Sequence, residues 1–498
     1  MKKNDLHHVA IIGAGAMGVA AFIALIRHQA AKRITLIDPK LPGQGIIYDC
    51  TDPELLCNTS VDLMAVLPVE FDDLLHYLYD QNQRHVMPSS FIPRCQAGTY
   101  VQDRFNYYLE LAEGYGIEVK QVRDHALQIV RDNDGSYRIE TNTEKIVQVS
   151  DVLVCNGYSR PRIPETLEPH IAEPSICISP YPERNLIQKM SPHHRILILG
   201  SKLSAVDASL VLCRDNHKVT MVSPSGELPA VRNHLIRSPK HLVEFAKSAA
   251  LAIDYQSDTI EQKLIELVLN TIAEVAPGPL SEQIATEKDT IALLRKEIEL
   301  AKMNKIHWEH TVFALVGAVN QAINPQDWQF VKKVKERYQG LLSRYVTAMP
   351  VENAHKLLRY MEEGCLKVCA GEVVGIERNE SHWLVRWRSG EVDSFDAIVS
   401  AIGYYYPSYH ATANTITLHD EPPRSLNSPE LTEDFRVKFP GSNEPERIWY
   451  TGIAANFGMP VVNGLFIGVD LVNKIVQKIV KLQEQPENTA SERQKSAT

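Results

Sequence analysis

A glycine-rich turn near the amino terminus constrains the fold more than any other part of this 498-residue chain. The apolar stretch 9–12 runs into Gly13, Gly15 and Gly18, and the apolar stretch 19–26 follows. This order predicts a strand, a turn and a helix. Gly13 permits the tight turn, Gly15 lets a pyrophosphate approach the backbone, and Gly18 lets helix and strand pack closely. The pattern predicts a Rossmann-type dinucleotide site, with the pyrophosphate at the positive end of the helix.

An acidic residue completes this first fingerprint. Asp38 ends a second apolar stretch, 34–37, and lies twenty residues beyond Gly18. A carboxylate at this place accepts hydrogen bonds from the hydroxyls of the adenosine ribose. The regularly spaced glycines also distinguish this segment from a signal peptide, whose apolar region is uninterrupted and ends in a cleavage site of small residues.

A second, incomplete fingerprint lies near residue 200. The apolar strand expected at 196–199 precedes Gly200, and an apolar helix is expected from residue 203. Lys202 occupies the place of the second glycine, and Ser204 follows in the first turn of the helix. We predict a second dinucleotide site here, bound to the backbone of Gly200 and to Lys202 and Ser204.

Three other segments place these sites in a larger architecture. A strand at 448–451 precedes Gly452, and a loop containing Asn463 leads into an amphipathic helix. The segments 151–164 and 395–407 are each a buried strand that ends in a glycine and then a proline, as in crossover links between domains. Their glycines are Gly157 and Gly403.

The order of these segments predicts an α/β protein with two Rossmann-type dinucleotide-binding domains. The three-part pattern resembles that of flavoproteins that bind two dinucleotides, and this resemblance implies an FAD domain split in sequence with an NAD(P)-type domain inserted into it. A further insertion is expected to be helical, since its apolar residues recur at helical spacing. The expected boundaries are FAD domain 1–185, NAD(P)-type domain 186–240, helical insertion 241–364, return to both domains 365–410, FAD-domain completion 411–483 and disordered tail 484–498.

Composition excludes several other classes of protein. The net charge of −9 and the pI near 6.1 argue against a nucleic-acid partner. No run of about 20 apolar residues is present, so we expect no membrane span. None of the eight cysteines forms a C-x-x-C pair, and we expect reduced thiols in a cytoplasmic protein with no bound metal.

Four further stretches carry a resemblance to a known family. They are GQGIIYDCTDPELLCNTS (43–60), FIPRCQAGTY (91–100), SPYPERNL (179–186) and SPSGELP (223–229). In this order they resemble a bacterial FAD/NAD(P)-binding family that is similar to the flavin-dependent N-hydroxylating monooxygenases. That family includes aspartate N-monooxygenase-like proteins and, more distantly, ornithine and lysine N-hydroxylases.

The resemblance implies several site residues. Gly45 and Tyr48 belong to a glycine-containing turn at the cofactor. Asn58 is implied beside the reactive edge of the flavin, with a turn-capping amide as the alternative. Arg94 is implied to bind an anionic substrate or a phosphate, with a structural ion pair as the alternative. The segment with Arg344 and His355 matches the family only loosely.

Lys202 leaves the state of the second site open. Its side chain crowds a pyrophosphate in the usual pose, but its ammonium group also offers a phosphate a positive charge. Residues 224 and 225 lack the basic groups that bind a 2′-phosphate, and Arg232 and Arg237 are the candidates to replace them unless both are ordinary surface charges.

The resemblance implies an FAD- and NADPH-dependent monooxygenase that hydroxylates the amino group of an amino acid or small amine through a flavin C4a-hydroperoxide. Its partners would be this substrate and molecular oxygen, and the helical insertion is interpreted as a helical lid or as the surface of a homo-oligomer. Two alternatives stay open. One is an FAD oxidase or dehydrogenase without a working nicotinamide site, which Lys202 favours. The other is a non-catalytic flavin-binding partner protein.

Overall fold

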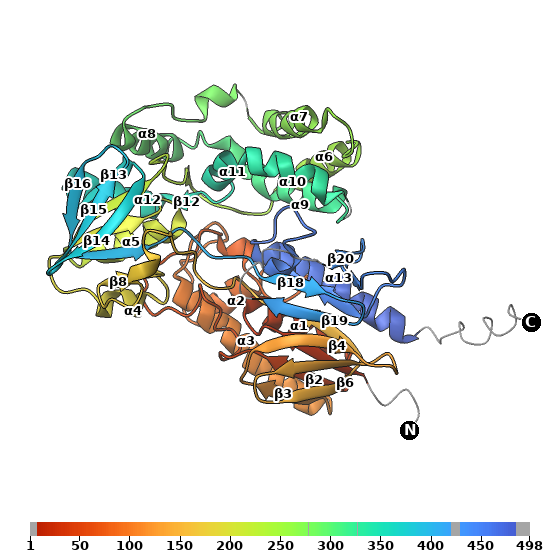
Figure 1. Ribbon diagram of the computed structural model, residues 1–498. Coiled ribbons are helices and arrows are strands. Elements are labelled where there is room, and N and C mark those ends of the chain that lie inside the picture. The colour runs from red at the N-terminus through yellow and green to blue at the C-terminus, as the bar shows by residue number, and fades with distance from the viewer. Residues whose placement is uncertain (1–6, 277, 326, 420–428, 485–498) are drawn as a thin grey trace, which may run out of the picture.

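The computed structural model describes residues 7–276, 278–325, 327–419 and 429–484, and it confirms the predicted fold class. Two five-stranded parallel sheets form the cores of two domains, and a layer of helices covers one side of the second (Figure 1). We call the domain that contains β1 the first domain and the domain that contains β9 the second domain. The predicted tail, residues 485–498, lies outside the described residues.

The first domain is built on strands that are buried on both faces. Their order is β22 (Ile448–Tyr450), β7 (Asp151–Val154), β1 (His8–Ile12), β2 (Arg33–Ile37) and β3 (Glu118–Val122). Such strands are continuous apolar runs, because helices cover both sides of a parallel sheet. The helices of this domain are α1 (Ala16–Arg27), α2 (Asp73–Asp80), α3 (Arg94–Gly114) and α13 (Leu465–Glu484).

The second domain repeats this arrangement. Its sheet has the order β13 (Leu366–Ala370), β10 (Lys218–Ser223), β9 (Arg195–Leu199), β17 (Ala397–Ser400) and β8 (Ile176–Cys177). Its helices are α4 (Glu183–Gln188), α5 (Leu203–Arg214) and α12 (Val351–Glu362). In the first sheet, β1 precedes the glycine turn and lies between β2 and β7. In the second sheet, β9 precedes the turn and lies between β10 and β17, so the two turns occupy equivalent places.

Each domain also contains an antiparallel excursion between its third and fourth parallel strands, which the sequence analysis did not anticipate. In the first domain, β4 (Ala126–Arg131), β5 (Tyr137–Thr141) and β6 (Lys145–Val149) pair with β18 (Ser408–Ala411) and β19 (Thr415–His419). In the second domain the excursion is β14 (Val373–Asn379), β15 (His382–Trp387) and β16 (Val392–Phe395). A short hairpin joins β20 (Glu430–Leu431) to β21 (Val437–Lys438).

The helical insertion forms the layer at the top of Figure 1. It comprises α6 (Lys240–Leu251), α7 (Ile260–Ala273), α8 (Thr290–Lys302), α9 (Val312–Ala322), α10 (Trp328–Arg337) and α11 (Gln339–Tyr345). The parallel pair β11 (Val231–Arg232) and β12 (Met349–Pro350) joins its two ends to the second domain. No helix within the described residues is both long and apolar enough to span a membrane.

Candidate functional site

The first glycine turn has the geometry of a dinucleotide cradle. Gly13 has φ +91°, which favours glycine, and a Cβ there would lie 2.6 Å from the Asn156 Cα. A Cβ on Gly18 would lie 2.0 Å from the Gly13 carbonyl oxygen, so only glycine permits this approach of helix and strand. Around Gly15 the space is open as far as Gly45, whose Cα would be 3.7 Å from a Gly15 Cβ. A side chain at either of these two positions would enter the cradle.

The groups around this cradle suit the pyrophosphate and ribose of FAD. Helix α1 has no side-chain cap, so the N–H groups of its first turn are available to a phosphate. Asp38 is held in place because its carboxylate accepts hydrogen bonds from Ala14 N (2.7 Å) and Lys40 N (2.8 Å). Burial raises the pKa of Asp38, and these backbone bonds oppose that rise. Each carboxylate oxygen retains a second acceptor site for a ribose hydroxyl.

Of the other residues predicted to bind the cofactor, Tyr48 and Gly452 lie against this cradle, while Asn463, Gly157 and Gly403 lie beside the links between the domains. Tyr48 packs under α3, where a Cβ on Gly98 would meet the Tyr48 carbonyl oxygen at 2.8 Å. A Cβ on Gly452 would meet the Met17 side chain at 2.7 Å, so the closing segment lies directly on α1. Asn463 is exposed and contacts the ring hydroxyl of Tyr158. Gly157 is exposed and Gly403 half-buried in the links between the domains, where neither would meet a neighbour through a Cβ.

The second turn keeps the backbone geometry but not the open cradle. Gly200 has φ +119°, and a Cβ there would lie 2.5 Å from the Ala401 carbonyl oxygen. Lys202 is the N-cap residue of α5, the place that Gly15 occupies for α1. Its ammonium nitrogen is buried without a hydrogen-bond partner among the described residues. Burial lowers the pKa of Lys202, while Glu227 opposes that change. Ser204 is half-buried in the first turn of α5.

Arg94 has the structural ion pair that was the alternative for this residue. It is buried at the first position of α3 and lies 2.7 Å from the carboxylate of Asp207 on α5. It also donates to the Tyr181 hydroxyl (2.8 Å) and the Leu56 carbonyl (3.0 Å), and Tyr181 donates to Asp207. Burial raises the pKa of Asp207, while Arg94 and Tyr181 oppose that rise. The guanidinium therefore joins the two domains, and its role in binding substrate stays a prediction.

Asn58 lies half-buried in the loop before the 3-10 helix η2 (Val61–Leu63). Within the described part of the chain its amide makes no hydrogen bond, so the turn-capping alternative is not observed. Its proposed position near the flavin stays a prediction. Neighbouring Ser60 and Asp62 bind the second domain, through Leu235 N (2.9 Å) and Arg237 N (2.7 Å) respectively.

The other basic candidates are already engaged within the protein. Arg232 is fully buried and donates to the Tyr345 and Val346 carbonyls, so it is not the ordinary surface charge that was the alternative for this residue. Arg237 pairs with Asp62 and Asp72.

The two loosely matched candidates differ in their surroundings. Arg344 is buried and pairs with Glu297. His355 is exposed on α12; partial burial and the charge of Lys302 lower its pKa, while Glu352 opposes that change. Arg344 lies close enough to the second turn for its charge to lower the pKa of Lys202, and it donates to the Leu228 carbonyl at 2.9 Å. The contacts of His355 give it no place at either glycine turn.

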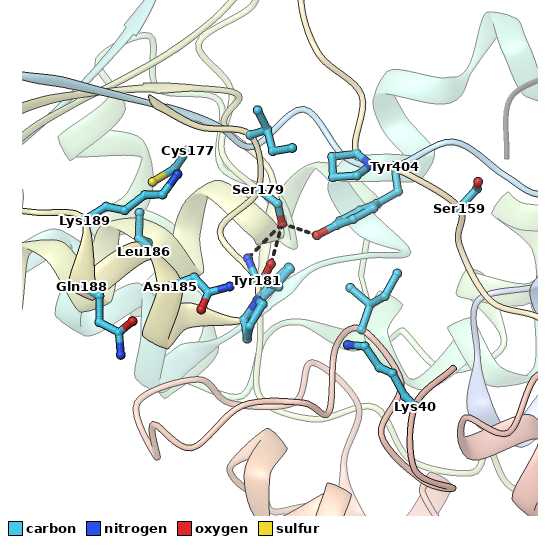
Figure 2. Close-up of a pocket in the computed structure, with 14 residues that line it drawn as sticks. Lys40, Ser159, Cys177, Ser179, Tyr181, Asn185, Leu186, Gln188, Lys189 and Tyr404 are labelled. Atoms are coloured by element: carbon cyan, nitrogen blue, oxygen red, sulfur yellow. Dashed lines mark hydrogen bonds between the residues drawn. The ribbon is translucent and has the colours of Figure 1, made fainter. Parts of the chain in front are cut away.

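A cavity of about 470 Å³ opens between the two domains beside their links. Figure 2 shows Lys40 on the side of the first domain and Ser179, Tyr181 and Tyr404 opposite it. The Ser179 hydroxyl accepts a hydrogen bond from Tyr181 N (2.9 Å) and also bonds the Tyr404 hydroxyl. Lys189 lines the far end and donates to the Ile176 carbonyl (2.9 Å). Lys40 pairs with Asp49 at 2.9 Å, so the cavity offers a polar ligand mainly the hydroxyls of Ser179 and Tyr404 and the Lys189 ammonium group.

Ser179, Tyr181 and Tyr404 were not predicted as site residues from the sequence. Ser179 and Tyr181 belong to the stretch 179–186 that carries the family resemblance, and Tyr404 follows Gly403 in the second link. The signal available was the concentration of hydroxyl-bearing residues beside both links.

Two family profiles match the chain. The family described as FAD-NAD(P)-binding matches residues 10–159, and the family described as pyridine nucleotide-disulphide oxidoreductase matches residues 86–261. No curated protein matches the chain in sequence. The first profile covers the open cradle and Asp38, and the second covers the turn with Lys202.

Several crystal structures are similar in fold. L-Lysine 6-monooxygenase from Pseudomonas syringae matches with a TM-score of 0.54 and 13% identity, over 96% of this chain and 99% of that chain. Bacillithiol disulfide reductase from Staphylococcus aureus matches with a TM-score of 0.47 and 13% identity over the same shares. Cyclohexanone monooxygenase in its open form matches with a TM-score of 0.45 and 14% identity, over 80% of this chain and 74% of that chain.

At 13% identity, the likeness to L-lysine 6-monooxygenase shows the fold alone. The profiles extend this to the cofactors, FAD and a nicotinamide nucleotide of the NADPH type. The chain is an FAD-dependent oxidoreductase.

Proposed function

We propose that this chain is an NADPH-fed flavin monooxygenase that hydroxylates the amino group of an amino acid or small amine. The observation that carries the proposal is the state of the cysteines around the first cradle. All eight cysteines are free and none forms a C-x-x-C pair. Burial raises the pKa of Cys57 and of Cys50 to about 12, so both stay protonated. A disulfide reductase needs a reactive thiolate beside its flavin, and these thiols do not provide one.

Two further observations favour amine hydroxylation over other oxygen chemistry. The stretches 43–60 and 91–100 resemble a bacterial FAD/NAD(P)-binding family that is similar to the N-hydroxylating monooxygenases. The fold is similar over almost the whole chain to an enzyme named for oxidation of lysine. A substrate of this class carries a primary amine that must be neutral to react, and the surrounding protein must exclude water.

The residues of this chain would hold and orient the cofactors. Bound FAD supplies the electron transfer and the oxygen chemistry. The backbone of Gly15 and the start of α1 would bind its pyrophosphate, and Asp38 would accept from its ribose. Asn58, whose amide has no partner in the described part of the chain, would donate to the substrate or the flavin edge.

Lys202 would bind a phosphate of NADPH through its ammonium group. The nitrogen is buried without a protein partner in the described residues, which is costly unless a ligand supplies an acceptor. The Cβ of Lys202 occupies space that Gly15 leaves open in the first turn, so the nucleotide would lie farther from the backbone. Charge on the side chain would replace part of the lost backbone contact.

The second candidate function is an FAD oxidase or dehydrogenase that takes its electrons from its own substrate. Lys202 is the observation that favours it, because the residue fills the cradle that a pyrophosphate normally enters. In that case the second domain would serve the fold alone. The predicted homo-oligomer, the cytoplasmic location and the exact domain boundaries remain predictions.

The two functions predict different products under air. The flavoprotein would be mixed under isotopically labelled oxygen gas with one amine (lysine, ornithine, aspartate or a simple alkylamine), both with and without NADPH. The hydroxylamine product would be assayed by mass spectrometry. The proposal expects one labelled oxygen atom in the product and NADPH consumption coupled to it. Oxidation of the amine substrate to a product that contains no labelled oxygen, at a rate independent of NADPH, would establish the oxidase instead.

A further inference from the structure

A cluster of two histidines and a glutamate lies in the helical part of the molecule, outside both glycine turns. His234 follows β11, and Glu309 and His310 belong to the 3-10 helix η5 (His307–Thr311). One nitrogen of each imidazole and one oxygen of the carboxylate all lie within 4.8 Å of one another. The two rings have centroids 4.8 Å apart. The fold thus brings together donor atoms from segments more than seventy residues apart.

The carboxylate of Glu309 is held in a fixed orientation. Its Oε2 accepts a hydrogen bond from the Asn233 backbone N–H at 2.8 Å. The side chain is only 1% exposed, so water does not reach it. Its Oε1 nevertheless has no hydrogen-bond partner among the described residues. The backbone therefore fixes one oxygen and directs the other toward the imidazoles.

The distances fit a small tetrahedral ion better than a hydrogen bond. His234 Nε2 lies 3.3 Å from Glu309 Oε1 without forming a hydrogen bond. Two ligand atoms that are each about 2.0–2.1 Å from a tetrahedral Zn²⁺ lie about 3.3–3.4 Å from each other. One ring nitrogen of His310 lies within 4.8 Å of a ligand atom of each of the other two residues and offers the third ligand position. Two imidazoles and one carboxylate form a ligand set that zinc prefers over magnesium or calcium.

The neighbouring charges set a limit on affinity. Arg232 is fully buried, and its positive charge acts on Glu309. Its Nη2 donates to two backbone carbonyls, so it is held in place by other groups. This charge favours the ionised carboxylate but opposes a bound cation. We therefore expect binding weaker than in zinc-finger sites, which have up to four thiolate ligands.

We propose that His234, Glu309 and His310 bind one Zn²⁺ per chain, with water in the fourth position. The ion would tie η5 to the loop that follows β11. Within that loop, Leu235 N donates to Ser60 and Arg237 pairs with Asp62, both near Asn58 in the first domain. The bound ion would thus stabilise the contact between the helical layer and the predicted flavin edge.

The test uses the full-length flavoprotein, freed of any purification tag and of metal by chelation and desalting. Zn²⁺ is titrated by calorimetry, and Co²⁺ is added as a spectroscopic probe whose tetrahedral absorption lies at longer wavelength than that of oxidised flavin. We expect one ion per chain, a tetrahedral Co²⁺ spectrum that Zn²⁺ abolishes, and a higher midpoint of thermal unfolding with Zn²⁺.

Three variants and a matched control assign the ligands. His234→Asn, His310→Asn and Glu309→Gln should each weaken Zn²⁺ binding at least about tenfold. Glu309→Gln keeps an oxygen for the Asn233 N–H, so it should retain its fold and its flavin. His307→Asn removes a histidine whose ring centroid is 6.4 Å from that of His310 and should bind Zn²⁺ as the wild type does.

Three results would overturn the proposal. They are the absence of stoichiometric binding to the wild type, an octahedral Co²⁺ spectrum, or an equal loss of affinity in His307→Asn. The Co²⁺ spectrum of the wild type decides the matter even where a variant fails to fold.

Discussion

The two glycine turns have the same backbone and different openings. Gly15 (φ −65°, ψ −165°) and Lys202 (φ −98°, ψ −167°) both cap a helix in an extended conformation. Gly13 and Gly200 both have positive φ. Gly13 lies against the backbone that follows β7, and Gly200 lies against the backbone that follows β17. The first glycine therefore determines the path of the turn, while the second position determines what can approach it. Lysine is compatible with the fold and changes only the contact with a ligand.

The third position differs for another reason. A Cβ on Gly18 would lie 2.0 Å from the Gly13 carbonyl oxygen. Its counterpart Ala205 carries a Cβ and is fully buried, so α5 packs on its strand with more room. Helix α5 also carries Asp207, whose ion pair with Arg94 joins the domains. The first turn is thus specialised for close backbone contact with a dinucleotide, and the second also holds the two domains together.

The largest effect should come from adding a methyl group to the first turn. Gly18→Ala places a Cβ against backbone that cannot move without breaking the turn, so we expect loss of folded, flavin-bearing protein. Ala205→Gly, the reverse change at the second turn, should retain flavin and cost about 1 kcal/mol through helix propensity. Flavin absorbance per chain and thermal unfolding measure both. Normal flavin content in Gly18→Ala would contradict the close packing described for α1.

The interdomain ion pair should give the next largest effect. Asp207→Ala leaves the Arg94 guanidinium buried without its carboxylate, and we expect a loss of about 3–5 kcal/mol in the free energy of unfolding. Asp207→Leu combined with Arg94→Met removes both charges and should recover much of this loss. Urea unfolding followed by flavin fluorescence provides the measurement. Equal destabilisation in the single and double variants would show that the pair contributes through packing alone.

Substitutions of Lys202 in the second turn should change the affinity for NADPH. Lys202→Met keeps bulk but removes charge, and we expect NADPH binding to weaken about tenfold, as for loss of a charge-assisted hydrogen bond. Lys202→Gly reopens the cradle and should lose less. Gly15→Lys, the matched change in the first turn, should reduce flavin content. Calorimetric titration of NADPH onto the oxidised flavoprotein measures the series. Tighter binding in Lys202→Gly than in the wild type would show that the lysine obstructs the site.

The smallest effect should be a difference in acid sensitivity between the two sheets. Burial lowers the pKa of His8, the first residue of β1, to about 4, whereas exposed Arg195 begins the equivalent strand β9. A histidine that is neutral when folded contributes full stability above its ordinary pKa of about 6.5 and loses it as the pH falls toward 4. His8→Asn should flatten this part of the pH profile of thermal unfolding. A profile identical to that of the wild type would assign the acid sensitivity to other groups.

The sequence predicted those features that depend on local patterns. Both turns, their strands and helices, and the helical insertion follow from glycine positions and apolar periodicity, and the resulting fold class is confirmed. The ion pair of Arg94 could not be assigned, because Asp207 is more than one hundred residues away and only the packing of the domains brings it close. The burial of Arg232 and the grouping of His234 with Glu309 depend on tertiary contacts in the same way.

The most direct test of the central claim is whether NADPH reduces the bound flavin under nitrogen. The reduction is measured as the loss of flavin absorbance after rapid mixing. The account predicts fast bleaching by NADPH in the wild type and slower bleaching in Lys202→Met at subsaturating NADPH. If NADPH and NADH both fail to bleach the wild type, and Lys202→Gly does not restore reduction, the second domain does not deliver hydride. The monooxygenase proposal in its present form would then be wrong.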